Sequence, residues 1–342
     1  MARVSQQQIA KELGLSQALV STALNGRKAQ VAAETYDKIW DYAKKVGYRP
    51  RGMQTDLLGK EQQSPKGVGF ILRSGLNIDS QNIYFSHIQT GLCQFLAQRE
   101  MHAVFLGNED LLDSKRMQSV RNVCGVVLFG EVSTAFLHDL IQLNHRVVSI
   151  SAYYPGWCHS VQSNETQGAM QVVEHLKQLG HKNIAWVGGL LGRQRSSQRR
   201  KALDEALAGF GMELSVDHIL ELPEATLKEG AKAGEWLVQM PRSKRPSAVV
   251  CFNSLMARGV ANHLLRNDMR IPEDIAIVSM DRTKVCSDDH PFITSAGANP
   301  ENIGAIAGDL ILKATGQQNE TFNDIVVASK LDIQASTKAS AK

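Results

Sequence analysis

The sequence lacks the features that mark secreted, membrane-spanning and metal-binding proteins. Its five cysteines are odd in number, and no two form a CxxC pair, which argues against a disulfide framework and a zinc site. No apolar run approaches the ~18 residues that a membrane-spanning helix needs, and no charged-then-apolar leader precedes the first predicted helix. We therefore expect reduced thiols, a cytoplasmic protein and no membrane partner.

Catalytic signatures are missing as well. The ten histidines form no HExxH motif, and the glycine-rich stretch 188–192 lacks the Lys-Ser/Thr pair of a phosphate-binding loop. We expect no enzymatic activity, no metal and no cofactor. The last residues (STKASAK) carry no leucine heptad, so nothing supports a coiled-coil tetramer.

What the chain does have is an uneven distribution of charge. Its composition of 43% hydrophobic and 21% charged residues is ordinary for a globular protein, and 342 residues predict two or three domains. Residues 1–60 hold ten Lys/Arg against five Asp/Glu, whereas the remainder carries a net charge of −1. A basic front end on a neutral body is expected where one part of a protein contacts nucleic-acid phosphates.

Three short helices are predicted in this front end. Ser5 is followed three residues later by Gln8, a capping box that predicts a helix over Ser5–Leu13. After Gly14, Ser16 caps a second run, QALVSTAL, which ends at an Asn-Gly turn. A third helix over Ala33–Val46 completes a helix-turn-helix domain.

The second helix separates polar from apolar side chains. At about 100° per residue, one side carries Gln17, Ala18, Ser21, Thr22 and Asn25. The other side carries Leu19, Val20, Ala23 and Leu24, which can pack on the first helix. The small and amide-bearing side is then free to enter a DNA major groove. A helical hairpin with a solvated face would show the same pattern, so these residues alone leave both interpretations open.

Beyond a Pro- and Gln-rich spacer, short apolar strands alternate with amphipathic helices. The predicted strands are Gly67–Leu72, Ala103–Gly107, Gly125–Gly130, Arg146–Ser151, Ile184–Gly189, Ala248–Asn253 and Ile275–Asp281. The predicted helices are Ile83–Glu100, Ser133–Leu143, Thr166–Leu179, Arg195–Phe210 and Leu255–Asn267. This alternation implies parallel sheets, and the division near residue 160 suggests two Rossmann-like lobes with a cleft between them.

Ligands of such sheets bind beyond the carboxyl ends of the strands. The polar residues at the predicted ends are Arg73, Ser74, Ser151, Arg193, Asn253 and Asp281. Tyr84 is among the nearby aromatic residues that could stack on a sugar ring. Asn253 could instead cap the following helix, and Asp281 could be a turn residue. The arginine run from Arg193 is either a solvated helix face or, through Arg193 or Arg195, a contact for an anionic ligand.

Longer motifs resemble those of the LacI/GalR family of bacterial transcriptional regulators. In the front end they are I-A-x-x-L-G-L-S-x-x-x-V-S-x-x-L-N-G (Ile9–Gly26), E-T-x-x-K-I (Glu34–Ile39) and V-G-Y-R-P (Val46–Pro50). In the body they are S-N-E-T-Q-G (Ser163–Gly168), E-H-L-x-x-L-G-H-x-x-I-A-W-V-G-G (Glu174–Gly189), C-F-N (Cys251–Asn253), R-I-P-E-D-I-A-I-V-S-M-D (Arg270–Asp281) and P-F-I-T-S (Pro291–Ser295).

The resemblance implies a three-helix helix-turn-helix domain followed by a bilobal, periplasmic-binding-protein-like α/β body. It further implies a homodimer on double-stranded operator DNA and a small, sugar-like effector between the lobes. The residues that match base-reading positions are Gln17, Ala18 and Thr22, and DNA-backbone contacts are expected from Ser5, Ser16, Ser21 and Asn25. Asn253 and Asp281 match positions that bind ligand hydroxyls, and Arg193 matches one that some members use for ligand.

The hinge departs from the family pattern Asn-x-x-Ala-Arg-x-Leu, whose Leu enters the minor groove. Leu57 matches that Leu, but Gln54 and Thr55 replace the Ala and the Arg, and Gly52 disfavours helix by about 1 kcal/mol relative to Ala. We hypothesise a weakly folded hinge or a different minor-groove contact. The candidate hinge residues are Arg51, Met53 and Leu57. If Leu57→Ala binds the operator with unchanged affinity in a gel-shift assay, then Leu57 makes no contact that matters for binding.

The predicted divisions are a helix-turn-helix domain (1–48), a hinge (49–65) and an effector-binding and dimerisation domain (66–342). Lobe one is expected at about 66–160 plus 296–320, and lobe two at about 161–295 plus 321–336. The expected function is an effector-controlled regulator of transcription, acting as a repressor. A stand-alone carbohydrate-binding protein of periplasmic type would have an export signal and would lack a basic front end. An enzyme would need a nucleophile or an acid–base pair at the strand ends.

Overall fold

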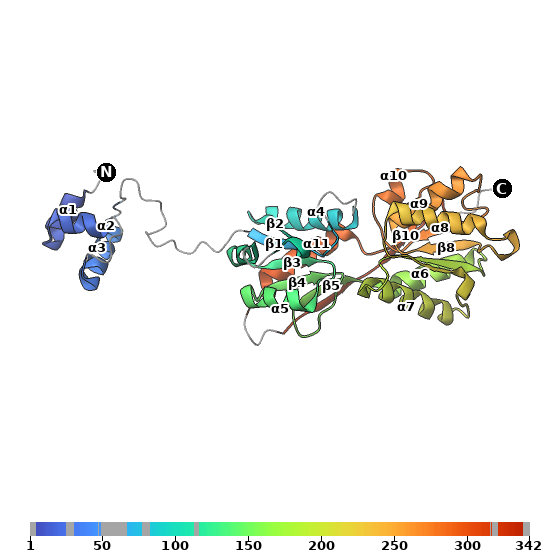
Figure 1. The fold of residues 1–342 in the computed structure, drawn as a ribbon, viewed down its shortest axis with the longest axis horizontal. Coiled ribbons are helices and arrows are strands. Elements are labelled where there is room, and N and C mark those ends of the chain that lie inside the picture. The colour runs from blue at the N-terminus through green and yellow to red at the C-terminus, as the bar shows by residue number, and fades with distance from the viewer. Residues whose placement is uncertain are drawn as a thin grey trace. The chain divides into compact units, whose positions relative to one another are not determined.

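A computed structural model describes residues 5–24, 31–46, 48, 67–76, 83–112, 116–314, 316 and 321–337 (Figure 1). The chain divides into two compact units, residues 1–64 and residues 65–342, which are considered one at a time. The candidate residues Asn25, Arg51, Met53 and Leu57 lie outside the described residues. The Asn-Gly turn and the hinge therefore stay predictions.

The first unit contains three helices, α1 (Gln6–Leu13), α2 (Gln17–Leu24) and α3 (Ala33–Lys45). The capping box is confirmed, because the Gln8 N–H donates to Ser5 Oγ at 3.2 Å and the Ser5 N–H donates to Gln8 Oε1 at 2.8 Å. Gly14 ends α1 in the left-handed region at φ 66°, a conformation that glycine adopts without steric cost.

All three helices contribute to one small core. Ile9 of α1, Leu24 of α2 and Ile39 of α3 are fully buried there. The indole Nε1 of Trp40 donates a buried hydrogen bond to the carbonyl of Ala23 at 3.2 Å. This bond satisfies a carbonyl near the end of α2 that the helix itself leaves without a partner, and it ties α3 to α2.

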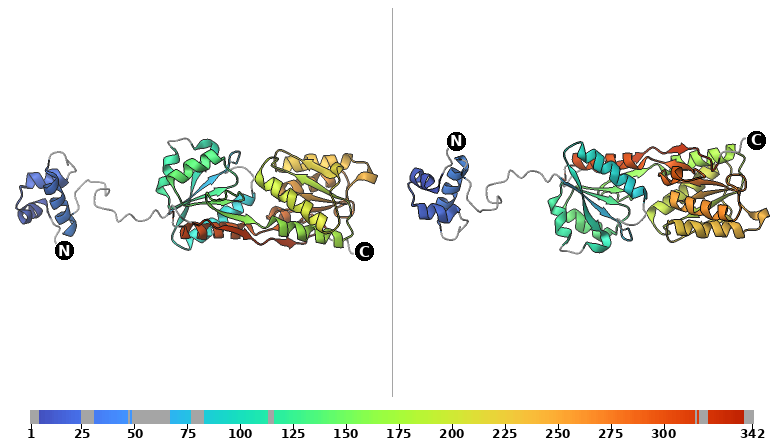
Figure 2. Two further views of the ribbon diagram at one scale, coloured as in Figure 1. Left: turned by 90° about the horizontal axis from the view of Figure 1, so that it is seen from below. Right: turned by 90° about the horizontal axis from the view of Figure 1, so that it is seen from above.

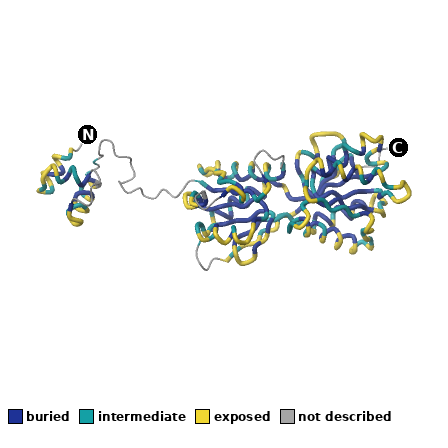
Figure 3. Tube along the Cα trace, viewed as in Figure 1, coloured by how far each residue is buried: buried dark blue, intermediate teal, exposed yellow. Residues whose placement is uncertain are grey.

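The second unit contains two six-stranded sheets, each with its own core (Figure 3). The first sheet has the order β11-β5-β4-β3-β1-β2, and all its pairings are parallel. Its strands are β1 (Gly67–Leu72), β2 (His102–Asn108), β3 (Val126–Phe129), β4 (Val147–Ile150), β5 (His159–Ser163) and β11 (Asp324–Val327). Helices α4 (Ile83–Ala97) and α11 (Pro300–Lys313) pack on one face, and α5 (Thr134–Leu143) packs on the other.

The second sheet has the order β12-β10-β9-β8-β6-β7, and only the β10–β12 pairing among these described strands is antiparallel. Its strands are β6 (Ile184–Gly188), β7 (Ile219–Glu221), β8 (Ala248–Cys251), β9 (Ala276–Ser279), β10 (Thr294–Gly297) and β12 (Lys330–Asp332). Its helices are α6 (Glu165–Gln178), α7 (Gln194–Gly209), α8 (Leu227–Gln239), α9 (Ser254–Arg266) and the short α10 (Val285–Asp288).

The described chain crosses between the lobes at three connections: after β5, after β10 and after β11 (Figure 2). The predicted assignment of 321–336 to lobe two is therefore wrong in its first part. Strand β11 pairs with β5 of the first sheet, with Ile325 opposite Val161, and only the following β12 joins the second sheet. The sequence pattern for β11 is weak, because β11 is a partly exposed edge strand of only four residues. Its position is set by pairing with β5 rather than by its own composition.

Candidate functional site

Helix α2 presents a polar face in the first unit. Gln17 and Ala18 are exposed and Thr22 is half-buried, while the opposite side of α2 lies in the core. Ser21 shares the polar face and is half-buried. The hydroxyl of Thr22 donates to the Ala18 carbonyl at 2.9 Å. The face is therefore built of small or flexible groups that allow another surface to approach closely.

Ser5 and Ser16 both act as helix caps. Ser16 Oγ accepts the N–H of Leu19 at 3.2 Å at the start of α2, as Ser5 Oγ accepts the N–H of Gln8 at the start of α1. Each hydroxyl oxygen is thus engaged by its own helix, but its proton is available to an acceptor. A phosphate at either helix start would also benefit from the positive end of the helix dipole.

A cavity of about 390 Å³ lies between the two lobes of the second unit. Six of the candidate ligand residues line it: Arg73, Tyr84, Ser151, Arg193, Asn253 and Asp281. Ser74 is not among the described residues that do so. Its carbonyl accepts Arg73 Nη1 at 2.8 Å, so Ser74 orients a lining arginine instead.

Asn253 and Asp281 have structural tasks inside this cavity. Asn253 caps α9: its Oδ1 accepts the N–H of Met256 at 2.9 Å, and its Nδ2 donates to the carbonyl of Ala225 at 2.9 Å. Asp281 is buried, and its Oδ1 accepts the N–H of Ser254 at 2.8 Å. The capping alternative that the sequence left open for Asn253 is therefore confirmed, and one Asp281 oxygen is engaged by the start of the same helix.

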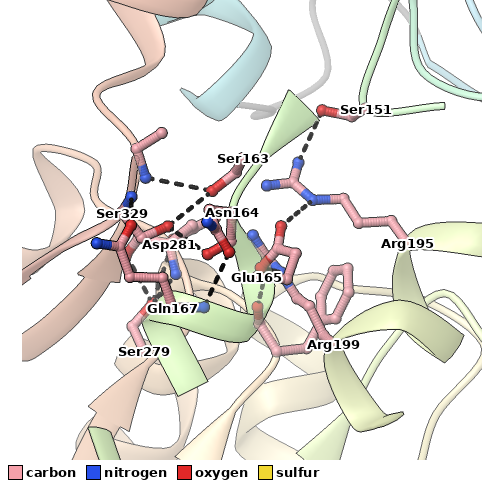
Figure 4. A network of polar contacts seen from close by, with 12 residues as sticks. Ser151, Ser163, Asn164, Glu165, Gln167, Arg195, Arg199, Ser279, Asp281 and Ser329 are labelled. Atoms are coloured by element: carbon pink, nitrogen blue, oxygen red, sulfur yellow. Dashed lines mark hydrogen bonds and ion pairs between the residues drawn. The ribbon is translucent and has the colours of Figure 1, made fainter. Parts of the chain in front are cut away.

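The wall between α6 and α7 carries two arginines that share one carboxylate (Figure 4). Glu165 Oε1 lies 3.3 Å from Arg195 Nε, and Glu165 Oε2 lies 2.9 Å from Arg199 Nε. The side chains of Glu165, Arg195 and Arg199 are 12%, 13% and 1% exposed. Arg199 Nη1 also donates to the carbonyl of Phe252. The pairing of Glu165 with Arg195 was not predicted from the sequence, because the two residues lie 30 positions apart and share no periodic pattern.

Both of these arginines have an unmet donor. In the described part of the chain, Arg195 Nη2 and Arg199 Nη2 are buried without a hydrogen-bond partner. The Arg195 guanidinium stacks on the Tyr84 ring at 4.2 Å from the centroid. The Tyr84 hydroxyl is buried and interacts with the Arg195 side chain. Burial lowers the pKa of Arg195, but nearby Tyr84, Glu165 and Asp281 outweigh it, so the pKa is raised overall and the group stays charged.

The start of α7 reaches from lobe two to lobe one. Gln194 Oε1 accepts the N–H of Tyr153 at 3.0 Å, and the Gln194 N–H donates to Glu131 Oε2 at 2.9 Å. The next residue, Arg195, donates from Nη1 to Ser151 Oγ at 3.2 Å. These contacts join the lobes at the cavity, so a molecule bound there would change how firmly they hold together.

Two possible features of the described residues are absent. Among the described residues, no group of three or more His, Cys, Asp or Glu side chains is placed to hold a metal ion. The described helices also include none with the length and apolarity to cross a membrane. The lining groups include hydrogen-bond donors, acceptors and aromatic rings.

Comparison with known proteins extends these observations to the whole chain. Residues 173–337 match the family model of a periplasmic binding protein-like domain. Catabolite control protein A of Staphylococcus xylosus is 26% identical to this chain over 96% of it and 98% of the relative.

Two solved structures share the fold over almost the full length. The transcriptional regulator CelR, in complex with cellobiose, has a TM-score of 0.68 at 20% identity and covers 98% of this chain and 100% of its own. The lac repressor dimer bound to operator and the anti-inducer ONPF also has a TM-score of 0.68, at 19% identity, with 99% and 100% covered.

A two-lobed body with an internal cavity, joined in one chain to a helix-turn-helix unit, defines the class of ligand-binding transcriptional regulators. In its motifs and over almost its full length, the chain is similar to regulators of the LacI/GalR family.

Proposed function

We propose that this chain represses transcription by binding operator DNA through its first unit, under the control of a small molecule bound between the lobes of its second unit. The observation that carries the proposal is the cavity lined from both lobes and bridged by the start of α7, in a chain whose basic front end has a polar helix face. The operator and cellobiose complexes of the two structural neighbours support the same pairing of partners.

On the DNA side, Gln17, Ala18 and Thr22 read base edges, since they lie on the polar face of α2. A glutamine recognises adenine with two hydrogen bonds, and small side chains allow close approach to the bases. Ser5, Ser16 and Ser21 contact phosphates, which position the helix without reading sequence. Asn25 is assigned to the same role, and Arg51, Met53 and Leu57 to the minor groove, from the sequence alone.

On the ligand side, Arg73, Tyr84, Ser151, Arg193, Asn253 and Asp281 contact the effector. The effector favours one arrangement of the lobes, and the coupling to DNA is the difference in its affinity for the two arrangements. The active form is a cytoplasmic homodimer, because two first units are needed for a two-fold related site. The stand-alone carbohydrate-binding alternative is not favoured, since full-length relatives are regulators.

The test is selection of DNA by the full chain from a random duplex library, followed by affinity measurements over a salt series. We expect one preferred sequence and an affinity that falls steeply with salt. Gln17→Ala should lower discrimination at one base pair by about 1–3 kcal/mol, whereas Gln7→Ala, an exposed glutamine on α1, should not. Failure to bind any duplex in a salt-dependent way would overturn the proposal.

A further inference from the structure

Resting on the proposed function, we propose that the effector carries an acidic group, a carboxylate or a phosphoryl group, and that Arg195 is the residue that selects it. Two buried donors in the cavity wall come from α7: Arg195 Nη2 and Arg199 Nη2. An unmet donor in a buried site is costly, and more so when it belongs to a charged group. A ligand that supplies acceptors removes that cost.

Several acceptors already present in this wall are engaged. Glu165 uses one oxygen for each arginine, Asn253 Oδ1 caps α9, and Asp281 Oδ1 accepts the N–H of Ser254. The wall therefore offers a ligand two charged donors that the described residues leave unmet. Two carboxylates, Glu165 and Asp281, act on Arg195, so the donors that remain unmet, rather than a net charge, distinguish this wall.

A charged oxyanion fits these unmet donors better than a sugar hydroxyl does. A carboxylate presents two oxygens and a phosphoryl group three, so one such group can meet donors from two arginines at once. On the far wall, Arg73 has both Arg193 and the acids Glu224 and Glu131 as neighbours, so those charges offset one another.

Arg195 is the residue to vary, because its guanidinium touches both lobes. It contacts Glu165 on lobe two and Ser151 and Tyr84 on lobe one. An anion held there would join the lobes through Arg195, which connects recognition of the charge to the arrangement of the lobes.

The first experiment uses inorganic phosphate and acetate as probes of the two acidic groups. The unfolding temperature of the full chain is followed as each is added, against sodium chloride of equal ionic strength. We expect a saturable rise with one or both anions. In Arg195→Gln the dissociation constant should increase about 10- to 100-fold, the loss of one charge-assisted hydrogen bond.

Two further variants separate binding from folding. Arg200→Gln is the matched control, because among the described residues Arg200 pairs with Asp204 and Glu221 and does not line the cavity; it should bind like the wild type. Arg195→Lys keeps the charge without the planar fork and should fall between the two. A rise that is linear and equal in all variants, or no anion-specific rise at all, would overturn the proposal, since excluded anions stabilise any protein in that way.

The second experiment compares matched neutral and acidic compounds by calorimetry: glucose with gluconate, and glucose with glucose 6-phosphate. Preference for the acidic member of either pair supports the proposal and identifies the acidic group, whereas equal or tighter binding of glucose contradicts it. If a neutral compound releases the protein from its selected DNA, this inference is wrong and the proposed function still stands. Absence of DNA binding would sink the proposed function instead.

Discussion

Asn253 lines the cavity as a ligand-binding residue would, but its side chain also holds two parts of the fold together. Its Oδ1 caps α9 and its Nδ2 holds the carbonyl of Ala225 in the preceding connection. With both ends engaged, this amide fixes the start of α9 beside the cavity. Its effect on a ligand is to hold the surrounding wall in position as much as to touch it.

We therefore predict that Asn253→Ala destabilises the ligand-free protein by about 1–3 kcal/mol, the sum of a lost cap and an unmet carbonyl. Asn253→Asp keeps the cap and should cost less. Urea unfolding midpoints measure this, with Asn164→Ala as the control, since that residue caps α6 through the same kind of bond and should cost about 1 kcal/mol. Equal stability of Asn253→Ala and wild type would show that the tie contributes nothing.

Glu221 is a residue whose charge the fold disfavours. Burial raises its pKa, and the indole N–H of Trp186, which donates to Oε1 at 2.8 Å, only partly offsets this. A carboxyl with a raised pKa in the folded state stabilises the fold when protonated. That contribution is fully present below the ordinary pKa of 4.5 and is lost as pH rises through the folded-state value.

Glu221→Gln cannot ionise and keeps an oxygen for Trp186. We expect its unfolding temperature, relative to wild type, to increase as pH rises from about the ordinary pKa of 4.5 toward neutrality and then to level off. Thermal unfolding of both proteins across this range checks the slope. A difference that stays constant or falls with pH would show that Glu221 is not held in a disfavoured charged state.

At the scale of elements, two helix pairs pack through glycines. A Cβ on Gly304 of α11 would lie 2.0 Å from the carbonyl oxygen of Ile88 in α4, and one on Gly91 of α4 would lie 1.9 Å from that of Glu301. Such contacts bring two backbones together and cannot be relieved by a rotamer change. Gly230 and Gly259 do the same between α8 and α9.

Gly304→Ala should therefore separate α11 from α4 and destabilise the protein by about 1–3 kcal/mol, the usual range for overpacking. Gly209→Ala, at the end of α7, meets no described atom within 4 Å and should stabilise by up to about 1 kcal/mol through helix propensity. Unfolding midpoints of the two variants measured side by side test this. A neutral Gly304→Ala would mean that α11 can shift freely.

Local signals explain which elements the sequence predicts. The capping box at Ser5 and the strand–helix alternation depend on residues that are close in the sequence, and both are found where they were expected. Strands β11 and β12 have four and three residues, too few for a periodicity, and pairing with β5 and β10 places them. The Glu165–Arg195 contact likewise depends on the folded sheet, whereas the strand ends predicted six of the residues that line the cavity.

For the whole molecule, the uneven charge indicates that the two units have different tasks. The basic excess lies in residues 1–60, so the salt dependence of DNA binding belongs to the front end. The second unit contains the cavity, and the sequence analysis predicts that it also holds the dimer together. In the proposed homodimer, two linked front ends would bind a two-fold related site with an effective concentration that neither has alone.

We accordingly predict that scrambling one half of a selected two-fold DNA site lowers affinity by about 100-fold or more, because the gain from linking two binding modules is about 10²–10⁴. Fluorescence anisotropy at one fixed salt concentration measures the loss, and light scattering of the complex should give two chains per duplex. The control duplex carries the same number of changes outside the two half-sites. Equal affinity for the intact and half-scrambled sites, with one chain bound to each, would mean that a single front end suffices and that dimerisation is not part of recognition.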